Sequence, residues 1–221
     1  MAASAARGRT ISALLMRPAA KVVVFLAALL PFAWLFYGAL TNQLGANPAE
    51  HLIRATGDWT LRFLCITLAV TPLRVITGTP ALARLRRMLG LFVYFYVVLH
   101  LLSYSWFDMG FDVPDIVKDI VKRPFILVGF SAFLLLTPLA ATSSNRAVKA
   151  IGAKRWQMLH KLVYGIAGLG LLHFFWMRAG KRDFAEVAVY AAIIAVLLGW
   201  RLVQFWQKRR TAAIARAGVA F

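Results

Sequence analysis

Residues 88–107 read MLGLFVYFYVVLHLLSYSWF, a run without Lys, Arg, Asp or Glu in which His100 is the only histidine. A helix needs about 20 predominantly apolar residues to cross the hydrocarbon core of a bilayer. Two other uncharged stretches are about as long, Val22–Leu40 and Pro124–Asn145. These three stretches predict an integral membrane protein.

A fourth apolar stretch, Phe63–Leu73, is too short to span alone, because Arg62 and Arg74 flank it. It spans if both arginines extend toward opposite interfaces, with Trp59 anchoring one end. Two more stretches become long enough when their aromatic flanks are included: Leu162–Met177 extended back to Trp156, and Val187–Trp200 extended to Trp206. We therefore expect an all-α bundle of about six transmembrane helices.

The composition supports a membrane location. Of the 221 residues, 61% are hydrophobic and only 15% are charged, whereas a soluble domain carries about 25% charged residues. The formal net charge is +18, but the basic residues form short clusters between apolar runs. This distribution is typical of the positive-inside rule and does not indicate nucleic-acid binding.

Cys65, the only cysteine, lies within an apolar run. One cysteine excludes an internal disulfide, a cysteine-ligated iron–sulfur cluster and a thiolate zinc site. The chain also lacks the C-x-x-C-H motif of covalent haem attachment.

The N-terminus is basic and rich in alanine, as in a signal peptide, but the apolar stretch that follows is longer than usual and no clear cleavage site ends it. We expect a retained helix. Residues 1–20 are then a basic N-terminal segment, 21–206 the membrane domain and 207–221 a basic tail.

The charges predict which side each loop faces. With a cytoplasmic N-terminus, 16 of the 26 basic residues lie on the cytoplasmic side and seven on the other. The cytoplasmic set is Arg7, Arg9, Arg17, Lys21, Arg74, Arg84, Arg86, Arg87, Arg146, Lys149, Lys154, Arg155, Lys208, Arg209, Arg210 and Arg216. The opposite set is Arg54, Lys118, Lys122, Arg123, Arg178, Lys181 and Arg182. All eight acidic residues are expected on that opposite side, and both termini in the cytoplasm.

The loop Asp108–Arg123 contains DVPDIVKDIVKR, whose apolar residues have helical spacing. A short amphipathic helix is expected here. It would lie at the membrane interface or against a partner, or simply cover the end of the bundle.

Three of the four histidines, His100, His160 and His173, fall in predicted spans. Ionisable side chains inside a membrane are costly and indicate function. His100 and His173 are expected at similar depth on different helices, where two imidazoles can ligate both faces of a haem iron. His160 lies about 20 Å from His173 along a helix, so it belongs to another site or is structural.

Several other residues allow two interpretations each. Gly165, Gly168 and Gly170 could admit a flat macrocycle or close helix packing. A cytoplasmic arginine set could hold an FMN phosphate or haem propionates, or merely determine topology: Arg84, Arg86, Arg87, Arg146 and Arg155. An outer aromatic set could lie near an electron exit, or belong to an interfacial belt: Trp106, Phe174, Phe175 and Trp176.

Four stretches resemble the MsrQ (formerly YedZ) family of the ferric reductase-like transmembrane superfamily. They are GDWTLRFLCITLAVTPLR (57–74), RRMLGLFVYFYVVLHLLSY (86–104), LTPLAATSSNRA (136–147) and RWQMLHKLVYGIAGLGLLHFFW (155–176). The resemblance covers about Lys21 to Trp206.

This resemblance implies a bacterial inner-membrane subunit that passes electrons from the quinol pool through haem b. The recipient would be a periplasmic molybdenum-containing methionine sulfoxide reductase (MsrP), which repairs oxidised proteins. FMN is also associated with the family. His100, His160 and His173 match its histidine positions.

The chain departs from the wider superfamily at the expected fourth histidine, where Arg86 and Arg87 stand 14 and 13 residues before His100. One haem site, His100 with His173, is therefore complete, whereas a second haem at His160 would need an unusual ligand. His160 could instead line a quinone or flavin site. The competing hypotheses are a histidine-using transporter or proton channel, and a non-catalytic membrane anchor; the absence of a predicted mid-membrane carboxylate disfavours the transporter.

Overall fold

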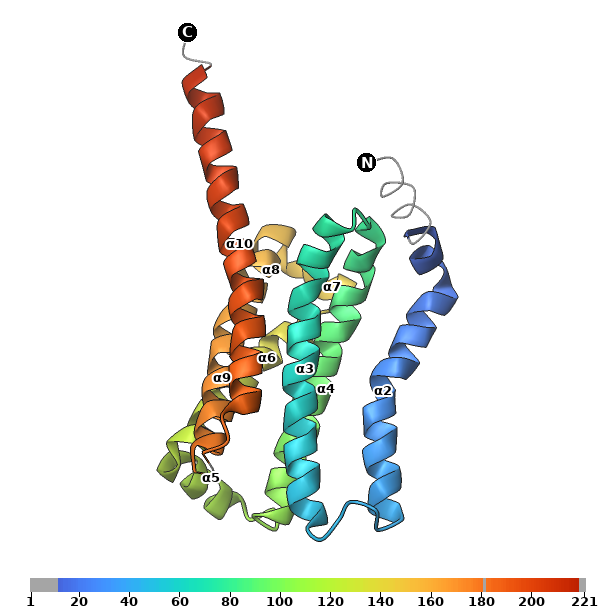
Figure 1. The fold of residues 1–221 in the computed structure, drawn as a ribbon, viewed down its shortest axis with the longest axis vertical. Helices are drawn as coiled ribbons and strands as arrows, with labels where there is room; N and C mark the ends of the chain where they lie inside the picture. Colours follow the sequence, from blue (N-terminus) through green and yellow to red (C-terminus); the bar gives the residue numbers. More distant parts are fainter. Residues whose placement is uncertain (1–11, 181, 219–221) are drawn as a thin grey trace.

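A computed structural model describes residues 12–180 and 182–218 (Figure 1). Within these ranges the chain is helical and contains no strand. The helices are α2 (Pro18–Leu40), α3 (Pro48–Ile76), the short 3₁₀ helix η1 (Pro80–Leu82), α4 (Ala83–Phe107), α5 (Val113–Lys122), α6 (Pro124–Ala141), α7 (Asn145–Ile151), α8 (Ala153–His160), α9 (Leu162–Ala179) and α10 (Ala185–Gly218).

Six segments of the described chain are long and apolar enough to cross a membrane. They are Pro18–Leu40, Pro48–Ile76, Pro80–Phe107, Pro124–Ala141, Ala153–Ala179 and Ala185–Ile214. The predicted all-α bundle with six spans is therefore confirmed. Which side of the membrane each terminus faces remains a prediction.

Two helical hairpins form the centre of the bundle, α3 with α4 and α6 with α9. Helices α3 and α6 begin at the end where α5 lies, and α4 and α9 return to that end (Figure 1). We call this the α5 end and the opposite end the α7 end. Helix α10 packs on α3 and α9, while α2 contacts α4 and α3.

Buried apolar residues join the two helices of the first hairpin. The ring of Phe63 on α3 stacks on Tyr96 and Phe92 of α4, with centroids 5.2 and 5.7 Å apart. Leu68 and Val93 are almost fully buried beside them. Since α3 must pack closely on α4, the positions of side chains on the two helices are fixed relative to each other.

Pro31 interrupts α2, and a side chain from α4 repairs the interruption. Tyr96 is 0% exposed. Its hydroxyl accepts a hydrogen bond from the Phe32 N–H (3.0 Å) and donates one to the Ala28 carbonyl (2.9 Å). The hydroxyl thus stands between two groups that would bond each other in a regular helix, as membrane helices with proline require.

A second proline is compensated in a similar way. Pro72 in α3 has no N–H, so the Leu68 carbonyl one turn earlier has no intrahelical donor. The guanidinium of Arg201 on α10 donates to that carbonyl at 2.6 Å. This hydrogen bond connects α10 to α3.

The prediction for the second span was wrong in its extent. Helix α3 begins at Pro48, well before Phe63, so Asp58 and Arg62 lie within the helix. The Arg62 Nε donates to the Tyr190 hydroxyl (3.2 Å), and its guanidinium lies 4.7 Å from the centre of the Trp59 ring. Neighbouring helices supply the polar contacts that the isolated segment lacks.

Other boundaries differ less. Helix α6 ends at Ala141 rather than Asn145, because Ser144 caps α7 through the Ala147 N–H. The fifth span is divided at Lys161 into α8 and α9. Helix α10 continues beyond Trp206 to Gly218 (Figure 1). The predicted positions of Arg7, Arg9 and Lys181 lie outside the described residues.

The predicted amphipathic helix is α5, which Asp112 caps through the Asp115 N–H. Ile120 is buried, whereas Val113, Val117 and Val121 are exposed along one side. The helix therefore covers the end of the bundle with one side and leaves a second apolar side uncovered.

Candidate functional site

Two of the three singled-out histidines come together between the central hairpins. His100 on α4 and His173 on α9 have ring centroids 6.1 Å apart, with ring planes at 77°. A bond between a metal and an imidazole nitrogen is about 2 Å long, so two imidazoles on one ion have ring centres about 6 Å apart. The separation fits a single metal ion between the two rings.

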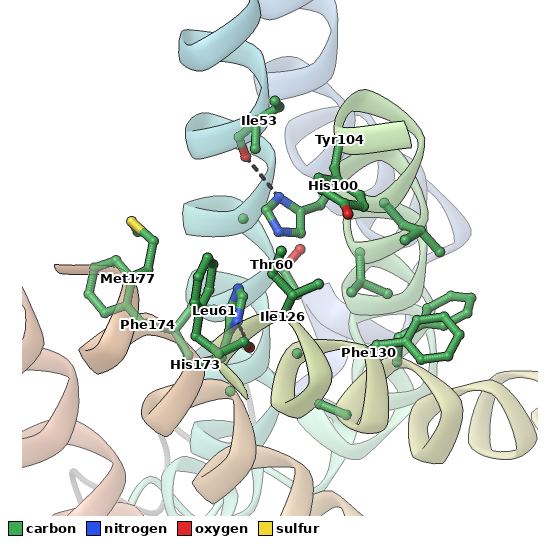
Figure 2. A pocket seen from close by; sticks show the side chains of 18 of the residues that line it. Ile53, Thr60, Leu61, His100, Tyr104, Ile126, Phe130, His173, Phe174 and Met177 are labelled. Atoms are coloured by element: carbon green, nitrogen blue, oxygen red, sulfur yellow. Dashed lines mark hydrogen bonds between the residues drawn. The ribbon is translucent and has the colours of Figure 1, made fainter. Parts of the chain in front are cut away.

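Backbone carbonyls fix both rings in the same way. The His100 Nδ1 lies 2.8 Å from the Ile53 carbonyl oxygen, and the His173 Nδ1 lies 2.7 Å from the Phe125 carbonyl oxygen. Nδ1 must carry the proton to donate to a carbonyl, so Nε2 keeps its lone pair. A protein typically holds a metal-ligating imidazole in this orientation. Figure 2 shows the two rings directed into one cavity.

A glycine makes room for each ring. A Cβ on Gly129 of α6 would lie 2.7 Å from the His173 Nδ1, and a Cβ on Gly57 of α3 would lie 3.1 Å from the His100 ring. Any larger residue at Gly129 would displace the ring. These glycines bring each carbonyl-bearing helix close enough to hold its histidine.

The two hairpins repeat this arrangement. Each histidine ring rests on a glycine of the preceding helix and bonds the carbonyl four residues before that glycine, which pairs Ile53 and Gly57 with His100, and Phe125 and Gly129 with His173. Helices α3 and α6 run in one direction and α4 and α9 run back, so the two hairpins present their histidines in the same way.

The cavity between the hairpins has a volume of about 320 Å³, within the range of about 300–1,000 Å³ typical of small-molecule sites. Its wall toward the α7 end is apolar. Each of the four central helices contributes one buried residue to that wall, Leu64, Val93, Leu136 and Ile166. Such a cavity suits a largely apolar molecule that carries a metal.

No group of three or more His, Cys, Asp or Glu side chains that could hold a metal occurs within residues 12–180 and 182–218. A bare ion between two imidazoles would lack most of its ligands. A haem iron has four nitrogens from its macrocycle and takes only two axial ligands from the protein. The histidine pair and the apolar cavity therefore fit a haem.

The cavity becomes charged toward the α5 end, where Glu50, Arg54, Asp108, Arg123 and the Tyr104 side chain line it. The Tyr104 hydroxyl donates to Asp119 (2.7 Å), which also pairs with Arg123 (2.8 Å).

The pKa of Asp108, just beyond the end of α4, is shifted by these charged neighbours and by burial. Partial burial of its carboxyl raises its pKa; the nearby Arg123 lowers the pKa, and the carboxylates of Asp119 and Glu50 raise it further. Charged groups from both hairpins therefore meet at one mouth.

His160 stands apart from the pair, at the α7 end. Its ring stacks on Trp156 at 3.8 Å and its Nδ1 lies 3.0 Å from the Trp156 carbonyl oxygen. Its Nε2 is buried and makes no hydrogen bond of good geometry with the described residues, which leaves its lone pair available to a ligand.

The other residues singled out from the sequence are distributed unevenly. None of Arg84, Arg86, Arg87, Arg146 and Arg155 lines the histidine cavity. Among the four aromatic residues, Phe174 is buried and lines it, while Trp106, Phe175 and Trp176 are exposed. Of the three glycines, Gly170 lines the cavity and Gly165 and Gly168 do not.

Sequence patterns did not predict the roles of Gly57, Gly129 and the two carbonyls that orient the histidines. A signal was present, because Gly57 precedes His100 by 43 residues and Gly129 precedes His173 by 44. Arg54 and Arg123 were assigned only to topology, since nothing in their local sequence indicates that they face a cavity.

A six-span helical bundle in which each of two hairpins supplies one histidine to a shared cavity is typical of membrane proteins that bind haem between their helices. Residues 56–171 match the model of the ferric reductase like transmembrane component family. The match runs from Thr56 in α3 to Leu171 in α9, so it includes His100 and ends two residues before His173. No solved structure matches the chain significantly.

Comparison with curated relatives identifies the family within this class. The chain is 76% identical over 205 residues to the protein-methionine-sulfoxide reductase heme-binding subunit MsrQ of Polaromonas naphthalenivorans, covering 93% of this chain and 94% of the relative. It is 59% identical to the MsrQ protein of Herminiimonas arsenicoxydans (86% and 87% covered) and 54% identical to that of Ralstonia nicotianae (91% and 93% covered). The chain belongs to the MsrQ family.

Proposed function

We propose that this protein is the haem-binding, electron-transferring membrane subunit of a methionine sulfoxide reductase system. The relatives are named as such heme-binding subunits. The observation that supports the proposal most directly is the His100–His173 pair, whose ring separation of 6.1 Å suits two axial ligands of one b-type haem.

The residues around the pair favour electron transfer over catalysis at the iron. With both axial positions taken by imidazoles, no position stays open for oxygen or a substrate. The Ile53 and Phe125 carbonyls hold the two rings in fixed orientation, so little rearrangement accompanies a change of charge. When bound, the haem supplies a reversible one-electron carrier.

The direction of transfer follows from the predicted topology. The charge distribution favours a periplasmic α5 end and a cytoplasmic α7 end in a bacterial inner membrane. The His100–His173 site then lies nearer the periplasm. We propose that electrons come from the quinol pool and leave at the α5 end toward a periplasmic molybdenum-containing methionine sulfoxide reductase, which repairs oxidised proteins.

His160 is proposed as a second cofactor contact. Its buried Nε2 and the basic residues at the α7 end, among them Arg86 and Arg87, would suit a second haem with an unusual second ligand, or the phosphate of FMN. A quinone headgroup would also accept hydrogen bonds there.

The ligand assignment is tested on the purified full-length protein by visible spectroscopy of the reduced state. We expect a b-type spectrum with two axial histidines, and its loss in His100→Ala and in His173→Ala. His51→Ala is the matched control, because His51 is exposed and does not line the cavity. Full haem content with unchanged spectra in both variants would refute the assignment.

The same preparation tests the other parts of the proposal. His160→Ala should lower the content of any second haem or FMN without changing the His100–His173 spectrum. Reduction of the haem by a soluble quinol analogue, followed by reoxidation with a periplasmic reductase of this type, tests the donor and the acceptor. A transporter, a proton channel or a simple anchor would show no haem spectrum.

A further inference from the structure

We propose that Arg54 and Arg123 bind the two propionates of the haem, so that its propionate edge faces the α5 end. This inference rests on the proposed haem site between His100 and His173. It assigns an orientation to the cofactor and a binding role to two residues that topology alone would explain.

The polarity of the cavity defines the orientation. A haem b is apolar around most of its edge and carries two carboxylates on one side. The wall at the α7 end offers only buried apolar side chains, Leu64, Val93, Leu136 and Ile166. Propionates directed there would be buried as unpaired charges, which is strongly unfavourable. Only the α5 end offers charged partners.

Arg54 and Arg123 are the only lysine or arginine residues lining the cavity within the described chain. Arg54 lies on the first hairpin, next to Ile53, whose carbonyl holds His100. Arg123 directly precedes α6 of the second hairpin, two residues before Phe125, whose carbonyl holds His173. Each hairpin thus supplies one arginine, one carbonyl, one glycine and one histidine, and the haem has one propionate for each arginine.

Acidic neighbours hold both guanidinium groups near the mouth. One terminal nitrogen of Arg54 contacts Glu50 at 2.5 Å, and the Arg123 Nε contacts Asp119 at 2.8 Å. A guanidinium has five N–H donors, and these two ion pairs use only part of them. Each arginine can therefore keep its acidic neighbour and bind a propionate, in the charge-assisted geometry that arginine forms with carboxylates.

Because acidic side chains also line the mouth, binding of the propionates there requires the positive charges of the two arginines. Glu50 and Asp108 also line the cavity there, and they would repel a propionate that no cation neutralises. Removing an arginine charge should weaken binding more than at a neutral mouth.

The test compares haemin with its dimethyl ester, in which both propionates are esterified and uncharged. Haem-free, full-length protein is prepared from cells blocked in haem synthesis and titrated with each compound by visible spectroscopy. The variants are Arg54→Gln, Arg123→Gln and the double variant. Lys118→Gln is the control, since Lys118 is exposed near the same end but does not line the cavity.

We expect each single variant to bind haemin about tenfold more weakly or worse, as expected from the loss of a charged hydrogen bond, and the double variant more weakly still. Binding of the dimethyl ester should be unchanged in all of them, which also shows that the variants are folded. Arg54→Lys and Arg123→Lys should recover part of the haemin affinity.

Three results would overturn the inference: haemin affinity unchanged in both single variants, equal weakening of haemin and ester, or recovery of no affinity by the lysine variants. Failure of the underlying haem proposal is distinguishable. In that case the unmodified protein would bind neither compound at the His100–His173 site.

Discussion

At the scale of single residues, the site depends on two positions where a side chain is absent. A Cβ at Gly129 would come within 2.7 Å of the His173 ring, and one at Gly57 within 3.1 Å of the His100 ring. The first separation is shorter than real Cβ contacts allow, whereas the second requires only a small shift. We therefore expect a substitution by alanine to disturb the site more at Gly129 than at Gly57.

We expect Gly129→Ala to lower haem content severalfold, because the His173 ring must leave its bond to the Phe125 carbonyl. Gly57→Ala should retain more haem with an altered spectrum. Haem-to-protein ratio in purified samples measures both effects. Gly168→Ala, where nothing lies within 4 Å of the new Cβ, is the control. Equal haem content in Gly129→Ala and Gly168→Ala would contradict the role given to Gly129.

Tyr96 is a second residue on which the fold depends, because its hydroxyl bridges two backbone groups of α2. Tyr96→Phe removes the hydroxyl that bridges the Phe32 N–H and the Ala28 carbonyl at the interruption of α2. We expect a loss of about 1–3 kcal/mol in stability, measured by thermal unfolding in detergent. Tyr94→Phe is the matched control, because the Tyr94 ring stacks on Phe133 and its hydroxyl makes no hydrogen bond with the described part of the chain. Similar losses in both variants would show that ring packing, not the hydroxyl, matters.

At the scale of helices, α3 shows why sequence patterns predicted some elements and not others. Spans such as Val22–Leu40 are uncharged throughout, so composition alone reveals them. Helix α3 contains Asp58 and Arg62, and their partners come from residues far away in the chain, such as Tyr190. Because local sequence does not show these distant partners, the charges of Asp58 and Arg62 predict that the span ends there.

In the candidate site, too, some features could be predicted from the sequence and others could not. The helical rise predicts His100 and His173 at similar depth, and the structure brings their rings together. The Ile53 and Phe125 carbonyls and the lining role of Arg54 could not be predicted, because they depend on how one helix faces another. Their local sequence is compatible with many other arrangements.

The contact between α10 and α3 can be measured as a coupling between two residues. Arg201→Met should destabilise the protein by about 1–3 kcal/mol, since the Leu68 carbonyl loses its donor. In a Pro72→Ala background the helix regains an N–H for that carbonyl, so Arg201→Met should cost less. A double-mutant cycle on thermal stability should give a coupling of about 1 kcal/mol. Additive effects would mean that Arg201 does not compensate for the proline.

At the scale of the whole molecule, the predicted topology can be tested with cysteine labelling. Cys65 is buried and should react slowly, so an introduced cysteine can be followed against a low background. We expect Val117→Cys on α5 to react with a membrane-impermeant maleimide in cells whose outer membrane is permeabilised. Lys149→Cys on α7 should react only after the inner membrane is opened. The reverse pattern would invert the proposed direction of electron transfer.

Haem should also act as a clamp between the hairpins, because His100 belongs to one and His173 to the other. A ligand that binds only the folded protein stabilises it by about 4 kcal/mol at a thousand times its dissociation constant. We expect the haem-loaded protein to unfold at a higher temperature than the haem-free form. His100→Ala should abolish this difference, and a persistent difference would place the stabilising ligand elsewhere.

The two repaired prolines have a consequence for biosynthesis. Helix α2 leaves the ribosome before α4, so the interruption at Pro31 has no Tyr96 hydroxyl until the third span has been inserted. Likewise the Leu68 carbonyl has no Arg201 donor until the sixth span, α10, has been made. Insertion into the membrane and completion of the bundle are thus separate events in time. A ribosome stalled before Arg201 should hold a nascent chain whose helices are inserted but whose α3 remains open to proteolysis or to chaperones of the membrane.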